Sequence, residues 1–493
     1  MDVKPILVTG ASGYVGGRLI PRLLDRGLSI RAMGRTLASL RGRAWSTDPR
    51  VELIRGDVLD ADALQRAASG CHAAYYLVHS MIAHKGAYAA ADRRAAANMA
   101  RAAEKAGLEQ VIYLSGLGES DHPKLSRHLA SRHEVGRVLQ AGKVPITVLR
   151  AAMVLGAGSA SFEILRYLSE RLPVMLTPRW VHTPTQPIAI SNVLDYLAGC
   201  LNYPAALGQT FDIGGPDILT YQDLINLYTD AAGLSRRLVL PVPVLTPSLS
   251  ALWIHLVTPV PAEIAMPLTE GLSVPTLCKD HRIRRLIPIK LVSCSQAIRE
   301  ALDQRLEIQA APCRLNAADP IPAEWIRCGD PVYTGGTVLE MAYEVAVTAA
   351  ADDLWPLISA IGGAHGYYFA DQLWRLRGLI DRLSGGPGIG NHQQSPRFTK
   401  VGDVFDFWQV QSFDPPRVLV LRSVMKTPGE ALFMLSLEPD KQGRTRIRLR
   451  ARFLPRGLAG LIYWYALYPV HHWIFKGMLG AMARHATGCA GPG

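Results

Sequence analysis

A glycine-rich stretch close to the N-terminus limits the fold of this chain more than any other feature. The apolar run ILVT at 6–9 leads directly into TGASGYVG at 9–16, and a helix-forming stretch follows. In this strand–loop–helix setting Gly10 allows a tight turn, Gly13 lets the backbone approach a pyrophosphate, and Gly16 allows close helix–strand packing. Backbone N–H groups at the start of such a helix favour an anion. The stretch therefore predicts a dinucleotide site, and a plain packing turn is the alternative.

The first part of the chain repeats this alternation of short apolar runs and helical stretches. Helical stretches such as 14–26, 62–69 and 88–106 separate the runs IRAMGR, VELIRGDV, AAYYLVHS, QVIYLSG, ITVLRAAMV and QTFDIGG. This rhythm predicts an α/β fold, a doubly wound parallel sheet of the Rossmann type with helices on both faces. A mostly helical region, about 217–308, follows. It is expected to form a substrate subdomain within a domain spanning 1–308.

The second half of the chain has a different pattern. Residues 309–336 are rich in Pro, Ala, Asp and Gly and are expected to be a linker. The runs TVLEMAYEVAV, VFDFWQVQSF, RVLVLRS, ALFMLSLEP and RTRIRLRARF then alternate with a period of two, and an apolar helix over about 458–485 ends the pattern. Residues 337–493 are therefore predicted to be an α+β antiparallel domain of helix-grip, START-like type. Its sheet would curl around the helix and enclose an apolar cavity.

Side chains of this second domain carry three further expectations. Arginines at every second position from 444 to 452 are expected on a solvated outer sheet face, with docking to the first domain or to an anionic surface as alternatives. His471 and His472 lack a matching ligand set, so no metal site is predicted. Nine aromatic residues are candidates for the cavity lining, and plain core packing is their alternative. They are Trp355, Trp374, Phe405, Phe407, Trp408, Phe433, Tyr463, Trp464 and Trp473.

Composition limits the classes of function. The chain has 493 residues, 49% of them hydrophobic and 19% charged, which is typical of packed globular domains. The net charge of +12 favours anionic partners, but the basic residues are dispersed without a recognised motif, so nucleic acid is not expected as a partner. The seven cysteines form no C-x-x-C pair, which predicts neither a zinc site nor a disulfide framework. A reducing, cytoplasmic location is the simplest interpretation.

One segment without charged residues, 238–262, approaches the length of a membrane span. Five prolines interrupt it, at positions 241, 243, 247, 259 and 261. Since proline breaks a helix, the unbroken remainder is too short to cross a bilayer. A buried or lid-like helix is expected, and peripheral contact with a membrane surface is the alternative.

The end of the second predicted strand indicates which dinucleotide binds. An NAD site usually has an acidic residue there for the ribose 2′-hydroxyl, but this chain has Gly34 and Arg35, with Arg31 earlier in the strand. A cation without a carboxylate suits a 2′-phosphate, so NADP(H) is preferred and NAD(H) stays an alternative. Asp57 and Val58 follow the third strand and are expected at the adenine edge. A turn or a helix cap is the alternative role for Asp57.

The motifs TGASGYVG, GDV, YYLVHSM and YLSGLG together resemble those of an atypical, extended short-chain dehydrogenase/reductase, similar to the sugar epimerases. Residues 158–181 and the C-terminal run YWYALYPVHHWIFKGML resemble bacterial two-domain proteins with a C-terminal DUF2867 domain. The resemblance covers almost the whole chain. It implies an NAD(P)-binding Rossmann domain and no established substrate.

The resemblance also implies where catalytic residues would lie. The family's serine position falls on Ser115, and its tyrosine and lysine positions fall on His128 and Arg132. Histidine can transfer a proton near neutral pH, whereas arginine keeps its charge and cannot deprotonate. Hydride transfer with His128 as the acid/base is one interpretation. The other makes His128 a surface histidine, and Arg132 a cofactor or salt-bridge arginine.

Further polar residues follow the predicted strands. His79 and Ser80 end the fourth strand beside the expected nicotinamide ribose, and Arg150 ends the sixth, where a structural ion pair is favoured over a place in the substrate pocket. Residues expected to contact the cofactor are Gly10, Ala11, Ser12, Gly13, Tyr14, Val15, Gly16, Arg35, Asp57, Val58, Leu77, His79 and Ser80.

These features support three hypotheses about function. The first is an NADP(H)-dependent oxidoreductase acting on a small apolar carbonyl, enone or quinone-like substrate, with the second domain binding or shielding the ligand. The second is a non-catalytic NADP(H)-binding sensor or assembly protein, which the missing Tyr-x-x-x-Lys pair favours. The third is a module that binds lipid or another hydrophobic ligand. The sequence does not indicate an oligomeric state.

Overall fold

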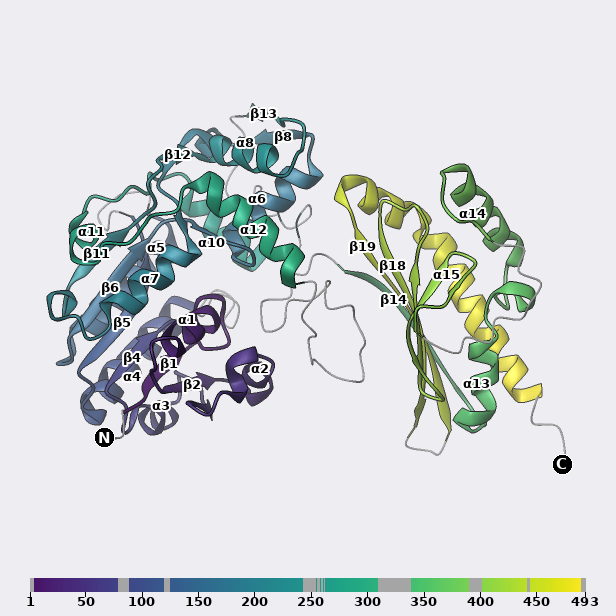
Figure 1. Cartoon of the computed structure of the whole chain (residues 1–493), viewed down its shortest axis with the longest axis horizontal. Coiled ribbons are helices and arrows are strands. Elements are labelled where there is room, and N and C mark those ends of the chain that lie inside the picture. Colours follow the sequence, from purple (N-terminus) through teal and green to yellow (C-terminus); the bar gives the residue numbers. More distant parts are fainter. Residues whose placement is uncertain are drawn as a thin grey trace. The chain divides into compact units, whose positions relative to one another are not determined.

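The computed structural model describes residues 4–78, 88–118, 125–242, 254, 258, 260, 262–308, 338–389, 401–440 and 444–488. These residues form two compact units (Figure 1). The first unit runs from strand β1 to helix α12, and the second runs from strand β14 to helix α15. The expected linker, 309–336, lies outside the described residues.

The first unit is built on a seven-stranded sheet with the order β11-β6-β5-β4-β1-β2-β3. All of its strand pairs are parallel, which confirms the predicted doubly wound sheet. The chain leaves β1 toward β2 and later returns to β4 on its other side, so the topological switch point lies between β1 and β4. The strands are β1 (Ile6–Thr9), β2 (Ile30–Gly34), β3 (Val51–Arg55), β4 (Ala73–Tyr76), β5 (Gln110–Gly116), β6 (Ile146–Ala151) and β11 (Thr210–Ile213).

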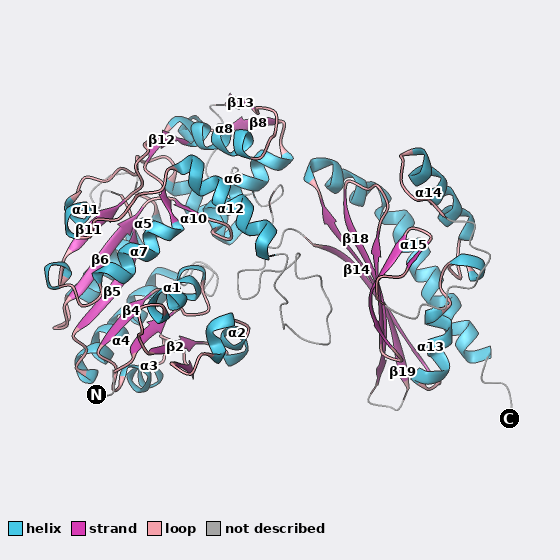
Figure 2. Cartoon of the chain, in the orientation of Figure 1, coloured by secondary structure: helices cyan, strands magenta, loops and turns pink. Residues whose placement is uncertain are grey.

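Helices cover both faces of this sheet (Figure 2). Successive residues of β1 point to opposite faces, so that Ile6 and Val8 join one apolar core while Leu7 joins the other. The first core contains side chains of α1 (Tyr14–Leu24) and α7 (Ile190–Cys200), and the second contains side chains of α3 (Ala61–Ala68), α4 (Tyr88–Ala106) and α5 (Arg127–Gln140). Burial on both faces explains why the strands are continuous apolar runs in the sequence.

A subdomain lies over the carboxyl ends of β5 and β6. Helices α6 (Ala160–Arg171), α8 (Tyr221–Ala231) and α12 (Cys294–Ile308) share an apolar core that includes Phe162, Tyr228 and Ile298. The subdomain therefore also uses the segment 154–189, between β6 and β11, in addition to residues from 217 onward. Its other elements are β7 (Val154–Leu155), β8 (Val174–Thr177), β9 (Pro184–Thr185), β10 (Ile188–Ala189), β12 (Leu219–Thr220), β13 (Leu238–Pro241) and α10 (Ala262–Gly271). Helix α11 (Arg282–Leu286) packs instead on the core of the seven-stranded sheet through Ile283.

The uncharged segment 238–262 is only partly described. Its first residues form β13, which pairs with β8, and Ile254 and Val260 are buried. The helix expected here lies mostly outside the described residues. Among the helices that the structure describes, none combines the length and the apolar character needed to cross a membrane.

The second unit has a six-stranded sheet with the order β14-β19-β18-β17-β16-β15. Every pair is antiparallel, which confirms the predicted antiparallel sheet. The strands are β14 (Leu339–Val347), β15 (Val404–Phe405), β16 (Trp408–Asp414), β17 (Val418–Ser423), β18 (Gly429–Pro439) and β19 (Thr445–Pro455). The helices are α13 (Ala351–Ser359), α14 (Asp371–Leu383) and α15 (Gly457–Gly488).

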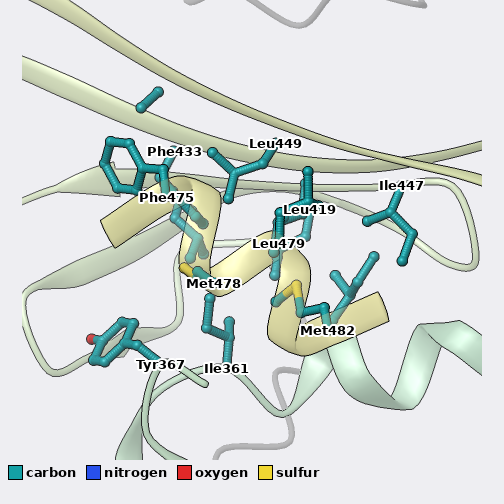
Figure 3. Packing of buried hydrophobic residues seen from close by; sticks show 14 of the residues in the cluster. Ile361, Tyr367, Leu419, Phe433, Ile447, Leu449, Phe475, Met478, Leu479 and Met482 are labelled. Carbon is teal, nitrogen blue, oxygen red and sulfur yellow. The ribbon is translucent and has the colours of Figure 1, made fainter. Parts of the chain in front are cut away.

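The two faces of this sheet differ in chemistry. Helix α15 packs on the apolar face, where Met478 and Leu479 meet strand residues such as Phe433 and Leu449 (Figure 3). The arginines of β19 lie on the opposite face, and Arg448 contacts carboxylates on both neighbouring strands. Alternation along β19 produces both faces, because its even-numbered positions from 446 to 452 carry arginine and its odd-numbered ones mostly carry apolar residues.

The expected outer arginine face is therefore present, with two differences. Arg444 precedes β19 and pairs with Asp440 at 2.9 Å, so four arginines and not five belong to the strand. Those four are paired with acidic residues, as shown by Arg448 with Glu344 at 2.9 Å and Arg452 with Glu340 at 2.7 Å. Arg452 is buried, at 5% exposure, so only the other three arginines of the strand lie on a partly solvated face. Partly exposed ion pairs contribute about 1 kcal/mol or less each, so the pairs of these three chiefly hold the side chains of that face in place.

Candidate functional site

The glycine loop connects β1 to α1 with the geometry that its spacing predicts. Gly10 has φ of +71°, and a Cβ atom there would lie 2.6 Å from the Leu77 carbonyl oxygen. A Cβ atom on Gly16 would overlap the Gly10 carbonyl, so this glycine lets the helix approach the strand. Gly13 is the N-cap of α1, and its N–H donates to the Gly10 oxygen at 2.9 Å. No described side chain caps α1, which leaves N–H groups for an anionic ligand.

Tyr14 of the loop has a structural contact in addition to its expected place at the cofactor. The Arg18 guanidinium lies 4.1 Å from the centre of the Tyr14 ring and donates to the Ala157 carbonyl at 3.0 Å. A Cβ atom on Gly156 would lie 2.5 Å from the Tyr14 hydroxyl oxygen. The Tyr14 side chain therefore joins the first turn of α1 to the subdomain.

The basic residues around β2 have different surroundings. Arg35 directly follows β2 at its carboxyl end and is exposed. Arg31 near the start of β2 pairs with Glu52 at 2.6 Å and donates to the Ala67 carbonyl at 3.0 Å. The interpretation of Arg31 as part of the phosphate site is therefore wrong, because its guanidinium holds β2 to β3 and to the end of α3.

Arg43 is a residue that sequence reasoning missed. It lies after helix α2 (Leu37–Arg41), it is 9% exposed, and its guanidinium donates to the Ser12 carbonyl of the glycine loop at 2.6 Å. A Cβ atom on Gly17 would lie 2.7 Å from the Arg43 Cζ, so the cation rests directly on α1. Its position in sequence gives no signal, since it is one of several arginines between β2 and β3.

The remaining predicted cofactor contacts follow β3 and β4. The Asp57 carboxylate accepts the Leu59 N–H at 2.9 Å, which is the turn proposed as its alternative role. Val58 is buried, and its carbonyl accepts from Asn98 at 3.0 Å. The Leu77 carbonyl faces Gly10, as described above. His79 and Ser80 lie outside the described residues.

Ser115, His128 and Arg132 line one cavity of about 320 Å³. Its floor is formed by the carboxyl ends of β5 and β6, and its walls come from α5, α6, α8 and α10. Most of the lining is apolar, including Leu117, Met153, Ile164, Leu165, Leu224, Ile225 and Ile254. A mostly apolar pocket with a few polar side chains is the usual arrangement of a small-molecule site.

Arg132 is fixed at the strand ends by backbone carbonyls. Its guanidinium donates to the Val78 carbonyl at 3.3 Å and to the Leu114 carbonyl, and it lies 4.8 Å from the centre of the Tyr113 ring. The Ser115 hydroxyl donates to the Arg132 carbonyl at 3.3 Å. These contacts anchor the first half of α5 to β5 and keep a permanent positive charge at the cavity.

The same contacts connect the cavity to the glycine loop. The Leu77 carbonyl oxygen faces Gly10. The carbonyl of the next residue, Val78, accepts a hydrogen bond from the Arg132 guanidinium. The cavity therefore begins one peptide unit away from the dinucleotide loop, at the switch point between β1 and β4. His128 is half-buried and lies four residues before Arg132, so both side chains lie on one face of α5.

Two other polar residues near this cavity were not predicted from the sequence. Tyr221 at the start of α8 lines the cavity, and burial raises the pKa of its phenol to about 12. His133 on α5 contacts the Gly116 carbonyl at 3.1 Å, and burial lowers the pKa of its imidazole. Tyr221 has no motif around it, and only the fold of the subdomain brings it to the cavity.

Arg150 has the structural role that was favoured for it. Its guanidinium pairs with Asp212 of β11 at 2.6 Å, and the other oxygen of this carboxylate accepts the Lys279 N–H at 2.9 Å. Arg150 is absent from the described cavity lining. The pair joins two neighbouring strands to the segment that precedes α11.

Comparison with known proteins follows the division into two units. Residues 10–166 match the family model described as NAD(P)H-binding, and residues 333–478 match DUF2867, described as a protein of unknown function. The first unit therefore resembles NAD(P)H-binding proteins over residues 10–166 and has a parallel sheet of the Rossmann type. More particularly, the two matches together confirm the predicted resemblance to an atypical short-chain dehydrogenase/reductase with a C-terminal DUF2867 domain.

Individual relatives match only part of the chain. Cinnamoyl-CoA reductase 1 of Oryza sativa subsp. japonica is 32% identical over 23% of this chain and 34% of its own length. Cinnamoyl-CoA reductase 2 of Arabidopsis thaliana is 24% identical over 42% of this chain and 72% of its own. The chain thus spans about a third of the length of the first curated relatives it matches.

The triphenylmethane reductase of Citrobacter sp. is a solved structure that is similar to part of the chain. It is 19% identical, covers 61% of this chain and 99% of its own, and has a TM-score of 0.49.

Proposed function

We propose that this protein is an NADP(H)-dependent oxidoreductase that reduces a small apolar carbonyl, enone or quinone-like molecule. The observation that carries the proposal is the shared cavity of Ser115, His128 and Arg132, which begins one peptide unit from the glycine loop. The apolar walls suit an apolar substrate, and the three polar groups at one end suit a single carbonyl oxygen.

The preference for NADP(H) rests on two arginines. Arg35 is exposed at the carboxyl end of β2, where an NAD site would usually carry a carboxylate. Arg43 adds a second positive charge, held on the glycine loop by the Ser12 carbonyl. Both charges favour the additional phosphate of NADP(H) over the hydroxyl of NAD(H).

A bound nicotinamide would supply the hydride, and the residues of the chain would bind and protonate the substrate. The Ser115 hydroxyl can donate to the carbonyl oxygen while the Arg132 charge stabilises the negative charge that develops there. His128 can deliver the proton in place of the family's tyrosine. The Tyr221 phenol is protonated at neutral pH, and burial raises its pKa further, to about 12, so its hydroxyl can orient a substrate from another wall.

Oxidation of NADPH across a panel of apolar aldehydes, ketones, enones and quinones tests this function. Replacing His128 or Ser115 by alanine is expected to lower kcat by about a hundredfold with either change. His281→Ala is the matched control, because His281 is exposed and absent from the described cavity lining. Turnover that is unchanged in both cavity variants would exclude the proposed roles.

A non-catalytic NADP(H)-binding protein is the second candidate. It is favoured by His128 and Arg132 in place of the tyrosine and lysine that the short-chain enzymes use. In that case NADPH would raise the melting temperature, and no compound of the panel would be reduced.

The second unit supports a third and narrower proposal. Its antiparallel sheet packed against the long helix α15 is consistent with a helix-grip, START-like ligand-binding fold. Peripheral membrane contact, a cytoplasmic location and the absence of a nucleic-acid partner stay predictions.

A further inference from the structure

The second unit contains a cavity of its own, with a volume of about 200 Å³. It lies between the sheet, α14 and α15, and its inner wall is aromatic, with Trp408, Phe433, Phe453 and Phe475. Of the nine aromatic residues expected to line a cavity, five do so: Trp374, Trp408, Phe433, Tyr463 and Trp464. Phe405 and Phe407 are instead buried in the core, Trp355 packs against it, and Trp473 is 55% exposed.

The polar groups of this cavity are mainly hydrogen-bond donors. The Arg377 guanidinium donates to the Tyr463 hydroxyl at 3.2 Å. The indole N–H of Trp374, a residue that is 9% exposed, and the Nδ1 atom of His471 are both buried without a hydrogen-bond partner among the described residues. Since buried polar groups are nearly always hydrogen-bonded, the Trp374 N–H indicates a ligand that carries an acceptor. The His471 Nδ1 atom can donate or accept, depending on the tautomer of the neutral ring.

The charge of the cavity agrees with an anionic ligand. Among the described residues, no carboxylate lines it, whereas Arg377 and Arg452 do. The Arg452 guanidinium is already paired with Glu340 at 2.7 Å. Asp381 lies one turn after Arg377 on α14, but its two oxygens accept the N–H groups of Gly388 at 3.0 Å and Lys426 at 2.8 Å. His471 is neutral at physiological pH, because burial and the nearby Arg377 charge lower the pKa of its imidazole to about 4. Besides the arginine that Glu340 neutralises, the site thus offers the Arg377 charge together with neutral groups.

The position of the entrance determines how a ligand would lie. Leu376, Ile380 and Val470 line the cavity and are also 51%, 46% and 43% exposed, so the mouth opens between α14 and α15 through an apolar rim. Arg377 is half-buried next to Leu376 of this rim, while the aromatic wall lies deeper. A ligand with an acidic head and a short apolar tail would place its head at Arg377 and its tail on the aromatic residues.

We propose that this cavity binds a medium-chain carboxylic acid. The carboxylate would accept from Arg377, Tyr463 and Trp374, and the tail would pack on Phe433 and Phe475. The volume lies below the range of about 300–1,000 Å³ that is typical of pockets for drug-sized molecules, so the tail is short. This site is independent of the dinucleotide and of the cavity in the first unit.

Titration calorimetry on the full chain with octanoate, and with 1-octanol as the neutral analogue, tests the proposal. Octanoate is expected to bind saturably and at least tenfold more tightly than octanol. Arg377→Gln should weaken octanoate binding by tenfold or more and leave octanol binding unchanged. Arg375→Gln is the matched control, because Arg375 is exposed on the same helix and absent from the described lining. Binding to Arg377→Gln that equals wild type would overturn the proposal.

A second variant distinguishes this cavity from the one in the first unit. Ala431→Phe adds a ring from β18 into the space next to Phe433, and it should abolish binding of both octanoate and octanol. The increase in melting temperature caused by NADPH should stay the same in both variants, which shows that the first unit is intact. Octanoate binding that persists in Ala431→Phe, or that is absent from wild type, would refute the site whether or not NADPH is oxidised.

Discussion

The two cavities of this protein obtain their polar groups in different ways. In the first unit Ser115 lies near the carboxyl end of β5. The Arg132 guanidinium donates to the Val78 carbonyl, which follows β4, and to the Leu114 carbonyl within β5. In the second unit Arg377 and His471 come from two helices that cover an antiparallel sheet. Parallel strands bring all their carboxyl ends to one edge, so the topology itself concentrates polar residues there. An antiparallel sheet has no such edge, and its site depends on which helix faces meet.

This difference predicts that the first cavity depends on the backbone of the glycine loop. Gly10→Ala combines a positive φ with a Cβ atom 2.6 Å from the Leu77 oxygen. We expect it to lower the free energy of unfolding of the first unit by more than about 3 kcal/mol and to abolish the NADPH-induced rise in melting temperature. Gly27→Ala is the control, because Gly27 has φ of +76° with nothing within 4 Å of its added Cβ atom. If both variants lost the same free energy of unfolding, the positive φ would account for the whole effect and the contact with Leu77 would contribute nothing.

The second cavity is expected to depend on side-chain packing instead. Met478 of α15 is 0% exposed and lies in the core between helix and sheet (Figure 3). Met478→Ala should lower the free energy of unfolding of the second unit by about 2–4 kcal/mol without changing NADPH binding. Lys476→Ala, at an exposed position of the same helix, should change it little. Urea unfolding followed by far-UV circular dichroism measures both, and an unaltered transition in Met478→Ala would contradict the packing.

The stability of the second unit is also expected to depend on the protonation of His471. The folded-state pKa of His471 is lowered to about 4 from the usual 6.5, so between these values the unfolded chain binds a proton that the folded chain does not. The free energy of unfolding of the second unit should therefore fall by about 2–3 kcal/mol as the pH drops from 6.5 to 4, and this contribution should level off below about pH 3, where the folded imidazole is protonated as well.

Carboxylates also titrate in this range, so the contribution of His471 is measured as a difference. His471→Phe should show a smaller loss of stability than wild type between pH 6.5 and 4. His472→Phe, at an exposed position of α15, should follow the wild-type curve. Parallel curves for wild type and His471→Phe would show that the imidazole is not buried as described.

The sequence predicts those features that local patterns determine. The period of the apolar residues gave both sheet types, and the glycine spacing gave the loop geometry, because each depends on residues close together in the chain. Arg43 and Tyr221 reach their sites through the return of α2 onto the glycine loop and through the docking of α8. The spacing of residues along the sequence predicts neither of these two contacts. His471 was examined as a metal ligand, but its role depends on Arg377 of another helix, which only the packing of α14 on α15 reveals.

The smallest expected effect concerns which dinucleotide the first unit prefers. Arg35 is exposed at the carboxyl end of β2, whereas Arg31 of the same strand is engaged by Glu52. Arg35→Ala should therefore weaken NADPH binding by about tenfold and leave NADH binding unchanged, because only NADPH carries the 2′-phosphate. Arg31→Ala should lower the melting temperature without altering the ratio of the two affinities. Fluorescence titration of each variant with both dinucleotides measures these ratios. A wild-type preference for NADH would contradict the role of Arg35, and an altered ratio in Arg31→Ala would show that the phosphate site extends along β2.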